Sequence, residues 1–396
     1  MRVLIAAASF PSSMSGLPRH AFNTARYLLQ HPAVTEVHLV IAPWQRHLIA
    51  EAGVDPGLRI QVHVAQMQRG SLSRNLWYYR GLPKLAAQLQ ADIVHFTYPM
   101  PVNAGAFRCP TVLTLHDLYP VEIPENFGYP KVIFNRLVLQ QCLRGADAIV
   151  CISDATRRLL RRYASARIWN KSVRIYNCVE APAQCAIDSP IPEWRGEPFF
   201  LCVAQHRRNK NIPLLVEAFH RLKQRRSVHA DLKLVVVGIG GPETRRIRQL
   251  ISALGLEKSV LLLEGLAEPE LQWCYARCEA MAAPSITEGF GAPVVEALLA
   301  GCRVVCSDIA AFREVGDSHC RFVALDGIAA DSLAGALSAA MRALAQEPVQ
   351  FPQCAARVFT ESHVDLYRSL IDRRSSKRVP QLSSALRATA SERQSL

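Results

Sequence analysis

The sequence predicts two α/β domains, each built on a doubly wound parallel sheet. The chain has 396 residues, whereas a single core usually stops growing near ~250–300 residues. Short apolar runs alternate with helix-period segments, and the runs lack the polar alternation of a half-exposed strand. The alternation stops once, between Glu180 and Pro198, where four prolines fall in a stretch without periodicity.

The first half of the chain alternates strand and helix signals. Strands are expected at Arg2–Ala8, Glu36–Ile41, Arg59–Val64, Asp92–Phe96, Thr111–Leu115, Ala148–Ile152 and Val173–Tyr176. Helices are expected between them at Arg19–Gln30, Leu72–Gln90, Lys131–Arg144 and Asp154–Tyr163. Repeated strand–helix units of this kind predict a parallel sheet covered on both faces.

The same alternation restarts after the proline-rich stretch. Strands are expected at Phe199–Ala204, Leu232–Val237, Val260–Leu263, Ala280–Ala283, Arg303–Cys306 and Cys320–Ala324. Helices are expected at Ile212–Arg226, Glu243–Leu254, Glu268–Cys278, Ala292–Ala300, Asp331–Gln346 and Phe359–Asp372. The predicted organisation is an N-terminal domain over 1–180, a linker over 181–198, a C-terminal domain over 199–350, a closing helix over 351–372 that returns to the first domain, and a disordered basic tail over 373–396.

Composition indicates a packed globular protein with an anionic partner. Hydrophobic residues make up 50% of the chain and charged residues 20%, which excludes a largely disordered protein. The formal net charge is +13, and such an excess favours nucleic acid, an anionic membrane surface or a phosphorylated ligand. The twelve cysteines contain no CxxC pair, so we interpret them as small buried residues in a reducing compartment.

The N-terminal apolar run is too short for a signal peptide, and Phe10-Pro11-Ser12-Ser13 follows it as a loop follows a strand. We therefore expect a first strand here and a cytoplasmic protein. No stretch reaches the ~20 apolar residues of a membrane span, so any membrane contact is expected to be peripheral.

The densest chemical signal is the segment from Pro284 to Ala297, which follows a strand and opens a helix. Gly289 and Gly291 permit close backbone approach to a ligand, and the helix start after Gly291 offers unpaired N–H groups to a phosphate. Glu288 and Glu296 are carboxylates that can accept hydrogen bonds from sugar hydroxyls. The alternative is a capped core helix with a surface glutamate.

Two further loops follow strands on the predicted cleft side. The run from Gln205 to Asn211 carries Arg207, Arg208 and Lys210, cations suited to a diphosphate, although a solvated basic loop has the same composition. His116-Asp117 follows the strand Thr111–Leu115, where the histidine is either structural or catalytic.

Together these segments resemble the retaining glycosyltransferases of family 4, which have the GT-B fold of two Rossmann-like domains facing a central cleft. The run from Glu288 to Glu296 is similar to the family's E-x7-E motif. Pro-Ser stands before it, and its second glutamate begins the usual Glu-Ala pair. The loop ending Lys210-Asn211 resembles the family's phosphate-binding loop, and His116-Asp117 resembles its acceptor-side pair. The resemblance extends from Met1 to about Asp372.

The resemblance implies a role for each matching position. Arg207 and Lys210 should hold the donor diphosphate, Glu296 the ribose, and Glu288 the hydroxyls of the transferred sugar. Backbone N–H groups at Phe290, Gly291 and Ala292 should complete these contacts. His116 should lie near the transferred sugar, with Gly16 in the loop beside it. The candidate catalytic residues are therefore His116, Arg207, Lys210 and Glu288, and the candidate donor-binding residues are Gly16, Phe290, Gly291, Ala292 and Glu296.

The resemblance also implies that no metal or other cofactor is needed, because the chain contains no DxD sequence and cations would neutralise the diphosphate. Some positions depart from the family pattern: the usual Gly-Gly of the first loop is Ser15-Gly16. Which of His206, Arg207 and Arg208 holds the diphosphate stays open. We favour GDP-mannose as the donor, and a UDP-sugar is the alternative.

Charge points to the acceptor side. Residues 1–190 carry 20 Lys and Arg against 11 Asp and Glu, whereas the rest of the chain carries 26 against 22. The segment Ser71–Lys84 mixes cations with interfacial aromatic residues, which is typical of a helix lying on an anionic leaflet, although a core helix with a wet arginine face also fits. We expect a lipid-linked saccharide acceptor, and a protein that is peripheral on the inner face of the cell membrane.

Other functions are less consistent with the sequence. No nucleic-acid-binding motif occurs and the positive charge is dispersed, which argues against nucleic acid as partner. The glycines of Gly238-Ile239-Gly240-Gly241 do not form the GxGxxG of a dinucleotide-binding oxidoreductase. A non-catalytic sugar-nucleotide-binding relative remains an alternative, against which the intact Glu288, Glu296 and Lys210 argue.

Overall fold

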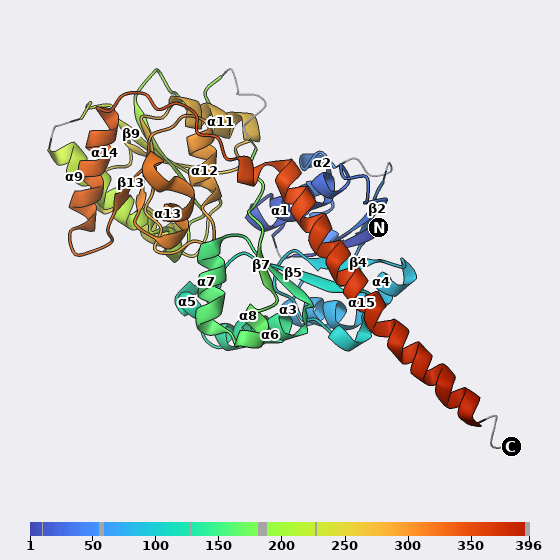
Figure 1. Ribbon diagram of the computed structural model, residues 1–396. Helices are drawn as coiled ribbons and strands as arrows, with labels where there is room; N and C mark the ends of the chain where they lie inside the picture. The colour runs from blue at the N-terminus through green and yellow to red at the C-terminus, as the bar shows by residue number, and fades with distance from the viewer. Residues whose placement is uncertain (10, 55–58, 127, 181–187, 226–227, 393–396) are drawn as a thin grey trace.

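The computed structural model confirms the predicted fold class: two parallel sheets, each flanked by helices, form two domains (Figure 1). The structure describes residues 1–9, 11–54, 59–126, 128–180, 188–225 and 228–392. No helix within these residues is long and apolar enough to cross a lipid bilayer.

The N-terminal sheet has seven strands in the order β3-β2-β1-β4-β5-β6-β7. They are β1 (Arg2–Ala6), β2 (Glu36–Ile41), β3 (Ile60–Val64), β4 (Ile93–Phe96), β5 (Thr111–Leu115), β6 (Ala148–Cys151) and β7 (Ser172–Arg174). Their helices are α1 (Gly16–Leu28), α2 (Leu48–Glu51), α3 (Ser71–Leu76), α4 (Leu82–Gln88), α5 (Tyr119–Glu122), α6 (Lys131–Gly145), α7 (Asp154–Tyr163) and α8 (Ala166–Trp169). The predicted helix 72–90 is interrupted by a π-helical turn at Trp77–Gly81, which joins α3 to α4.

The C-terminal sheet has six strands in the order β10-β9-β8-β11-β12-β13. They are β8 (Phe199–Val203), β9 (Lys233–Val237), β10 (Val260–Leu263), β11 (Ala280–Ala283), β12 (Val304–Ser307) and β13 (Cys320–Val323). Their helices are α9 (Ile212–Gln224), α10 (Thr244–Ala253), α11 (Glu268–Arg277), α12 (Ala292–Leu299), α13 (Ala310–Gly316) and α14 (Ala329–Met341).

Strand order in both sheets reverses beside the first strand of the domain. In the first sheet β1 lies between β2 and β4, and in the second β8 lies between β9 and β11. Open α/β sheets bind ligands outside the carboxyl ends of their strands at such a reversal. The topology therefore directs attention to the loops that follow β1, β5, β8 and β11.

The closing helix α15 (Ala356–Glu392) packs on the N-terminal domain (Figure 1). Phe359, Val364 and Tyr367 are buried in the same core cluster as residues of α1 and β1. The Tyr367 hydroxyl contacts Nδ1 of His95 on β4 at 2.6 Å, and Thr114 Oγ1 on β5 contacts the other ring nitrogen at 2.7 Å. The last helix of the chain thus completes the core of the first domain.

The helix α15 extends to Glu392, into the segment 373–396 for which the sequence predicts a disordered tail; residues 393–396 lie outside the described part of the chain, and the disorder of the tail stays a prediction. Ala, Leu, Gln and Arg in this segment favour a helix, whereas Pro380 inside it lacks a backbone N–H and opposes one. Of the predicted linker, residues 181–187 lie outside the described part. In the remainder, Ile191 is buried in the C-terminal core, where Trp194 packs edge-on to Trp273.

A glycine allows the two domains to meet. Gly289, in the loop after β11, lies so close to the N-terminal domain that an added Cβ would be 1.7 Å from the carbonyl oxygen of His116. The Gly289 carbonyl accepts hydrogen bonds from the hydroxyls of Ser153 and Thr156, at the start of α7. The backbone of the loop after β11 is therefore in direct contact with the N-terminal domain.

A carboxylate from the second domain caps α7 at the same junction. The side chain of Glu314 on α13 accepts hydrogen bonds from the backbone N–H groups of Asp154 and Ala155, both at 2.7 Å. Ser153 caps the next free donor by accepting from the Thr156 N–H. Because helix N-termini favour negative charge, Glu314 holds the domains in one orientation.

We predict that Gly289→Ala prevents the domains from docking. The added Cβ would clash with the carbonyl oxygen of His116, and the backbone of His116 directly follows β5, which holds it in place. Small-angle scattering should show an increased radius of gyration. Gly335→Ala on α14 is the matched control, since its Cβ would meet nothing within 4 Å. An unchanged radius in Gly289→Ala would contradict this account of the junction.

A second prediction concerns the buried histidines under α15. Burial lowers the pKa of His95 well below its usual value and that of His363 to about 4. Unfolding returns both to about 6.5, so the unfolded chain binds protons that the folded chain does not. The free energy of unfolding should therefore fall as the pH drops from about 6.5 towards 4.

Denaturant titrations across this pH range test the expectation. His363→Phe keeps the ring and the helical backbone bonds but cannot be protonated, so the acid loss should be shallower by up to ~1.4 kcal/mol per pH unit. The exposed His319→Phe should retain the original slope. Equal slopes in all three proteins would show that His363 is not titrating as described.

Candidate active site

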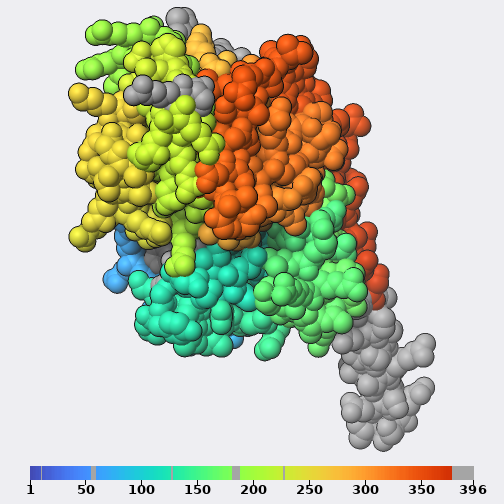
Figure 2. Space-filling view, turned by 90° about the vertical axis from the view of Figure 1, so that its left-hand side faces the viewer, coloured from blue at the N-terminus to red at the C-terminus, as the bar shows by residue number. Residues whose placement is uncertain are grey.

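The site residues gather where the carboxyl ends of the two sheets face each other. His116 and Asp117 directly follow β5, and Arg207 and Lys210 lie in the loop after β8. Glu288 lies in the loop after β11, and Glu296 is on α12. Figure 2 shows the domains meeting along a seam, with the segment from α5 to α8 on one side and the C-terminal domain on the other.

Lys210 and Glu288 bind each other. Lys210 Nζ lies 2.5 Å from Glu288 Oε1, and the side chains are 19% and 9% exposed, so water screens this pair poorly. Ser285 Oγ donates to the same carboxylate oxygen at 2.7 Å. The two groups expected to hold the diphosphate and the transferred sugar therefore form one buried polar cluster.

Tyr119 of α5 joins the N-terminal domain to this cluster. Its hydroxyl donates to Glu288 Oε2 at 3.2 Å and accepts from Asn209 Nδ2 at 3.2 Å. Nearby, the Thr287 hydroxyl donates to Glu122 at 3.1 Å. Both sides of the cleft thus contact the loop that carries Glu288.

Glu296 lies in a second polar cluster, near α1. Tyr275 donates to Glu296 Oε2 at 2.8 Å, and burial raises the pKa of the Glu296 carboxyl, which the charge of Arg19 opposes. Arg19 belongs to the first domain and pairs with Glu268 at 2.5 Å across the cleft. A carboxylate held in this way can accept hydrogen bonds from two adjacent hydroxyls.

The start of α12 provides backbone donors between these clusters. Gly291 is its N-cap, in the left-handed region with φ of +94°, and no side chain caps the helix. A Cβ there would lie 2.7 Å from the ring of Phe312, so glycine is required both by conformation and by space. Phe290 is buried and Ala292 begins the helix. Pro293 has no N–H and the Val294 N–H donates to the Gly291 carbonyl at 2.9 Å, so the N–H groups that suit an anion are those at the helix start, Gly291 and Ala292.

His206, Arg207 and Arg208 of the basic loop differ in their suitability to hold a diphosphate. His206 is buried, contacts Thr244 through Nδ1 at 2.9 Å, and has a pKa lowered by burial, so it is neutral near pH 7. Arg207 and Arg208 are both exposed. Arg207 Nε donates to Gln205 Oε1 at 2.9 Å, a contact within the basic loop itself.

His116 is a neutral histidine whose tautomer can be inferred. Burial lowers its pKa to about 4, and Nε2 lies 2.8 Å from the carbonyl oxygen of Thr97. A carbonyl only accepts, so Nε2 carries the proton and Nδ1 is left as an acceptor. Next to it, burial raises the pKa of Asp117 to about 6, and its Oδ1 accepts the Tyr119 N–H at 3.0 Å.

Gly16 is the first residue of α1, where a Cβ would meet nothing within 4 Å. The α1 residue that contacts His116 is His20, one turn later, with ring centroids 4.6 Å apart. Sequence reasoning did not single out His20, Tyr119, Asn209, Tyr275 or Arg19. Tyr119 and Asn209 lie within or beside quoted motifs, whereas nothing in the sequence marks Tyr275.

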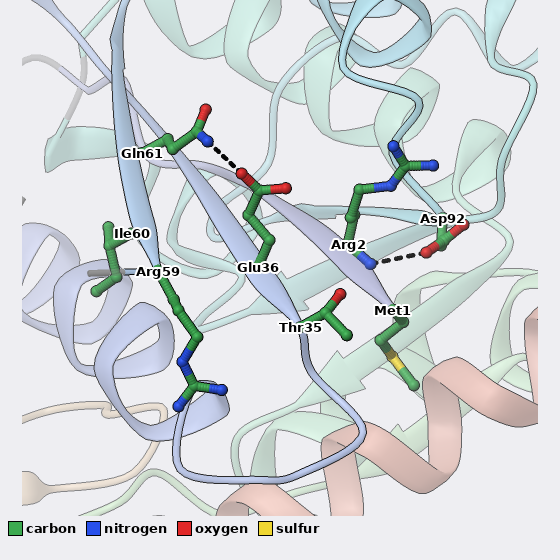
Figure 3. A pocket seen from close by; sticks show the side chains of 8 residues that line it. All are labelled: Met1, Arg2, Thr35, Glu36, Arg59, Ile60, Gln61 and Asp92. Carbon is green, nitrogen blue, oxygen red and sulfur yellow. Dashed lines mark hydrogen bonds between the residues drawn. The ribbon is translucent and has the colours of Figure 1, made fainter. Parts of the chain in front are cut away.

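A cavity away from these residues lies at the amino ends of β1, β2 and β3 (Figure 3). It measures about 360 Å³, and its acids already have partners: Asp92 accepts the Arg2 N–H, and Glu36 accepts from Gln61. It is at the opposite edge of the sheet from His116. Across the described residues, no group of three or more His, Cys, Asp or Glu side chains is placed to hold a metal ion.

Comparison with known proteins agrees with this geometry. The family model described as Glycosyltransferase Family 4 matches residues 14–181, and that described as Glycosyl transferases group 1 matches residues 187–347. The two matches together take in both domains and every expected site residue.

Curated relatives are similar over part of the chain. The O-antigen chain mannosyltransferase RfbU of Salmonella typhimurium is 27% identical over 56% of this chain and 56% of its own length. O-antigen chain mannosyltransferase B of Escherichia coli is 27% identical over 52% of this chain and 55% of its own. A Campylobacter jejuni N-acetylgalactosaminyltransferase, named for a diphospho-undecaprenol-linked acceptor, is 38% identical over 28% of each chain. The chain thus spans about half the length of the first two relatives.

Solved structures share the fold over nearly the whole chain. WaaG, a glycosyltransferase involved in lipopolysaccharide biosynthesis, aligns with a TM-score of 0.65 at 17% identity and covers 94% of this chain and 98% of its own. Anabaena HepE in complex with UDP and glucose aligns with a TM-score of 0.62 at 18% identity, covering 97% and 100%. Fold, motif and family matches agree: the chain belongs to family 4 of the retaining glycosyltransferases and has the GT-B fold.

Proposed function

We propose that the protein transfers a hexosyl group from a nucleotide sugar to a saccharide acceptor, with retention of anomeric configuration, in polysaccharide or glycolipid assembly. The observation that carries the proposal is the cluster of Lys210, Glu288 and Tyr119 at the domain junction. A cation of the C-terminal domain and a hydroxyl of the N-terminal domain there lie within hydrogen-bond distance of the same carboxylate.

On the donor side, Lys210 and Arg207 bind the diphosphate and stabilise the charge that develops on the leaving nucleoside diphosphate. The backbone N–H groups of Gly291 and Ala292, at the start of α12, share this charge. Glu296 accepts hydrogen bonds from the ribose hydroxyls, and Glu288 from those of the transferred sugar. Donor binding requires the Lys210–Glu288 pair to separate, so each group exchanges its present partner for part of the donor.

On the acceptor side, neutral His116 binds the transferred sugar or the incoming hydroxyl through Nδ1. The acceptor oxygen bonds to the anomeric carbon while the bond from that carbon to the donor phosphate breaks, and the acceptor proton passes to a phosphate oxygen. We propose that the cationic side chains make a divalent metal unnecessary for this step.

GDP-mannose is the proposed donor. The support is that several relatives, including RfbU, are named as mannosyltransferases. A UDP-sugar is the alternative, and UDP is the nucleotide in the HepE complex. A non-catalytic sugar-nucleotide-binding protein is the second alternative, against which the complete set of Lys210, Glu288 and Glu296 argues.

The proposed acceptor is a lipid-linked saccharide, with the protein working from the cytoplasmic side as a peripheral membrane protein. The name of the Campylobacter relative describes a saccharide on diphospho-undecaprenol. The positive excess of the N-terminal half suits such an anionic acceptor.

A panel of GDP- and UDP-sugars should identify the donor, because a ligand that binds only the folded protein raises its melting temperature. We expect GDP-mannose to give the largest shift and to release nucleoside diphosphate when lipid-linked acceptor is added, with or without EDTA. Release that EDTA abolishes would refute metal independence. Binding without release under any condition would favour the non-catalytic alternative.

Lys210→Ala and Glu296→Gln should each lower kcat/KM by about 100-fold or more, since each removes a charged contact to the donor. Lys258→Ala and Glu217→Gln change exposed residues of the same types and should leave the rate unchanged. Melting curves establish that each variant is folded. Near-normal transfer by folded Lys210→Ala would disprove the assigned donor site.

A further inference from the structure

Two segments of the N-terminal domain expose an unusual amount of apolar surface. Of the thirteen large hydrophobic side chains that are exposed among the described residues, seven lie in α3 and the turn after it, or in α6 and the residue pair before it. They are Leu72, Leu76, Tyr79, Tyr129, Ile133, Phe134 and Leu137. We name this surface the α3–α6 face.

The two segments are neighbours in space. Both pack their inner sides on the same core cluster, α3 and its turn through Tyr78 and α6 through Leu139. The loop after β4 bridges them: Asn103 donates to the carbonyl of Tyr79 at 3.3 Å, and Gln141 exchanges two hydrogen bonds with the backbone of Val102. Figure 1 shows α3 and α6 on the same side of the domain.

The charges of this face have one sign. Residues 59–91 and 126–146 contain no Asp or Glu. The exposed charged side chains of the two segments and of adjoining α4 are all cations, namely Arg80, Lys84, Lys131, Arg136 and Arg144. Within the described part of the chain, Arg80, Lys84 and Lys131 form no ion pair. Apolar side chains interspersed with cations match an anionic lipid surface, whereas a second copy of the chain would bring like charges together.

A short path connects this face to the active site. Arg136 of α6 donates to the carbonyl of Pro120 at 2.7 Å, and the preceding residue, Tyr119, contacts Glu288. The α5 helix therefore lies between the face and the acceptor side of the cleft. If the lipid of an acceptor lies in a membrane beneath α6, its saccharide reaches the cleft by extending past α5 alone.

Only part of the segment Ser71–Lys84, which the sequence suggested as a helix on a membrane surface, is exposed in the structure. Tyr78 and Leu82 are buried, and Trp77 packs against the core, so half of that segment is committed to the fold. Four of the seven exposed apolar side chains come from Tyr129 and α6 instead. The sequence predicted a helix at the position of α6 but no role in membrane contact for it.

We propose that the α3–α6 face docks on an anionic phospholipid bilayer, with the outer side of α6 inserted at the interface. This inference rests on the proposed function, because it names the surface on which a lipid-linked acceptor would be met. The apolar side chains of Ile133, Phe134 and Leu137 insert into the interface. The cations of the face are attracted to the anionic headgroups, and each contributes about 1 kcal/mol near the surface.

Flotation of the full chain with vesicles tests the proposal. Vesicles of phosphatidylcholine with phosphatidylglycerol should carry the protein at low ionic strength, whereas phosphatidylcholine alone should carry little. The triple variant I133S/F134S/L137S should lower the partition coefficient at least about tenfold. The control I328S/L344S removes apolar side chains of the C-terminal domain that are at least as exposed, and it should float like the original protein.

Brominated lipids locate the contact. Phe134→Trp should gain fluorescence that these lipids quench, and Leu344→Trp, at a position 92% exposed, should gain fluorescence that they do not. Equal flotation of the triple variant, or no flotation of the original protein, would overturn the proposal. So would a dimer in sedimentation that the triple variant abolishes, because the face would then bind a second copy.

Donor binding separates this inference from the proposed function. The triple variant should keep the donor-induced rise in melting temperature and nucleoside diphosphate release with a water-soluble acceptor. If both proteins float alike but release nucleotide, the docking surface is wrong and the transferase assignment stands. If neither binds any donor while flotation depends on α6, the surface stands and the assigned activity is wrong.

Discussion

The active site depends on one contact, the approach of the Gly289 backbone to the carbonyl of His116. Each domain alone presents only half of the required chemistry, and the carboxylate that contacts Tyr119 is adjacent to this glycine. The missing side chain lets the donor loop reach the other domain, where Ser153 and Thr156 hold its carbonyl. Glu314 then fixes the angle by capping α7. The geometry of the candidate site is therefore a property of the junction as much as of either sheet.

Buried polar groups at this junction are held by neighbours from both domains. Lys210 and Glu288 compensate each other's desolvation, and Ser285 and Tyr119 satisfy remaining lone pairs of the carboxylate. Such a pair contributes little net stability but makes removal of either partner costly. It keeps both groups oriented towards each other, and a ligand that replaces both partners at once avoids an unpaired intermediate.

Much of the fold could be predicted from the sequence because its strands are apolar runs such as Lys233–Val237 that have no competing periodicity. Short elements could not: α5 has four residues, one of them proline, and no periodicity can be read over so few positions. The expected site residues carry recognisable spacing, from Glu288 to Glu296 above all. Their partners do not, since Tyr119 and Glu314 meet residues about 160 positions away and only the relative placement of the domains brings them together.

The return of α15 to the first domain has a consequence for biosynthesis. Phe359, Val364 and Tyr367 fill the core beside α1, yet they leave the ribosome after the whole C-terminal sheet has emerged. The two core clusters of the C-terminal domain consist of residues that precede α15, so this domain can complete its core first. Until α15 is made, the N-terminal domain exposes the apolar surface that α15 later covers. The domain that is translated first is thus the last to be completed, and a nascent chain arrested before Ala356 would present that surface to chaperones.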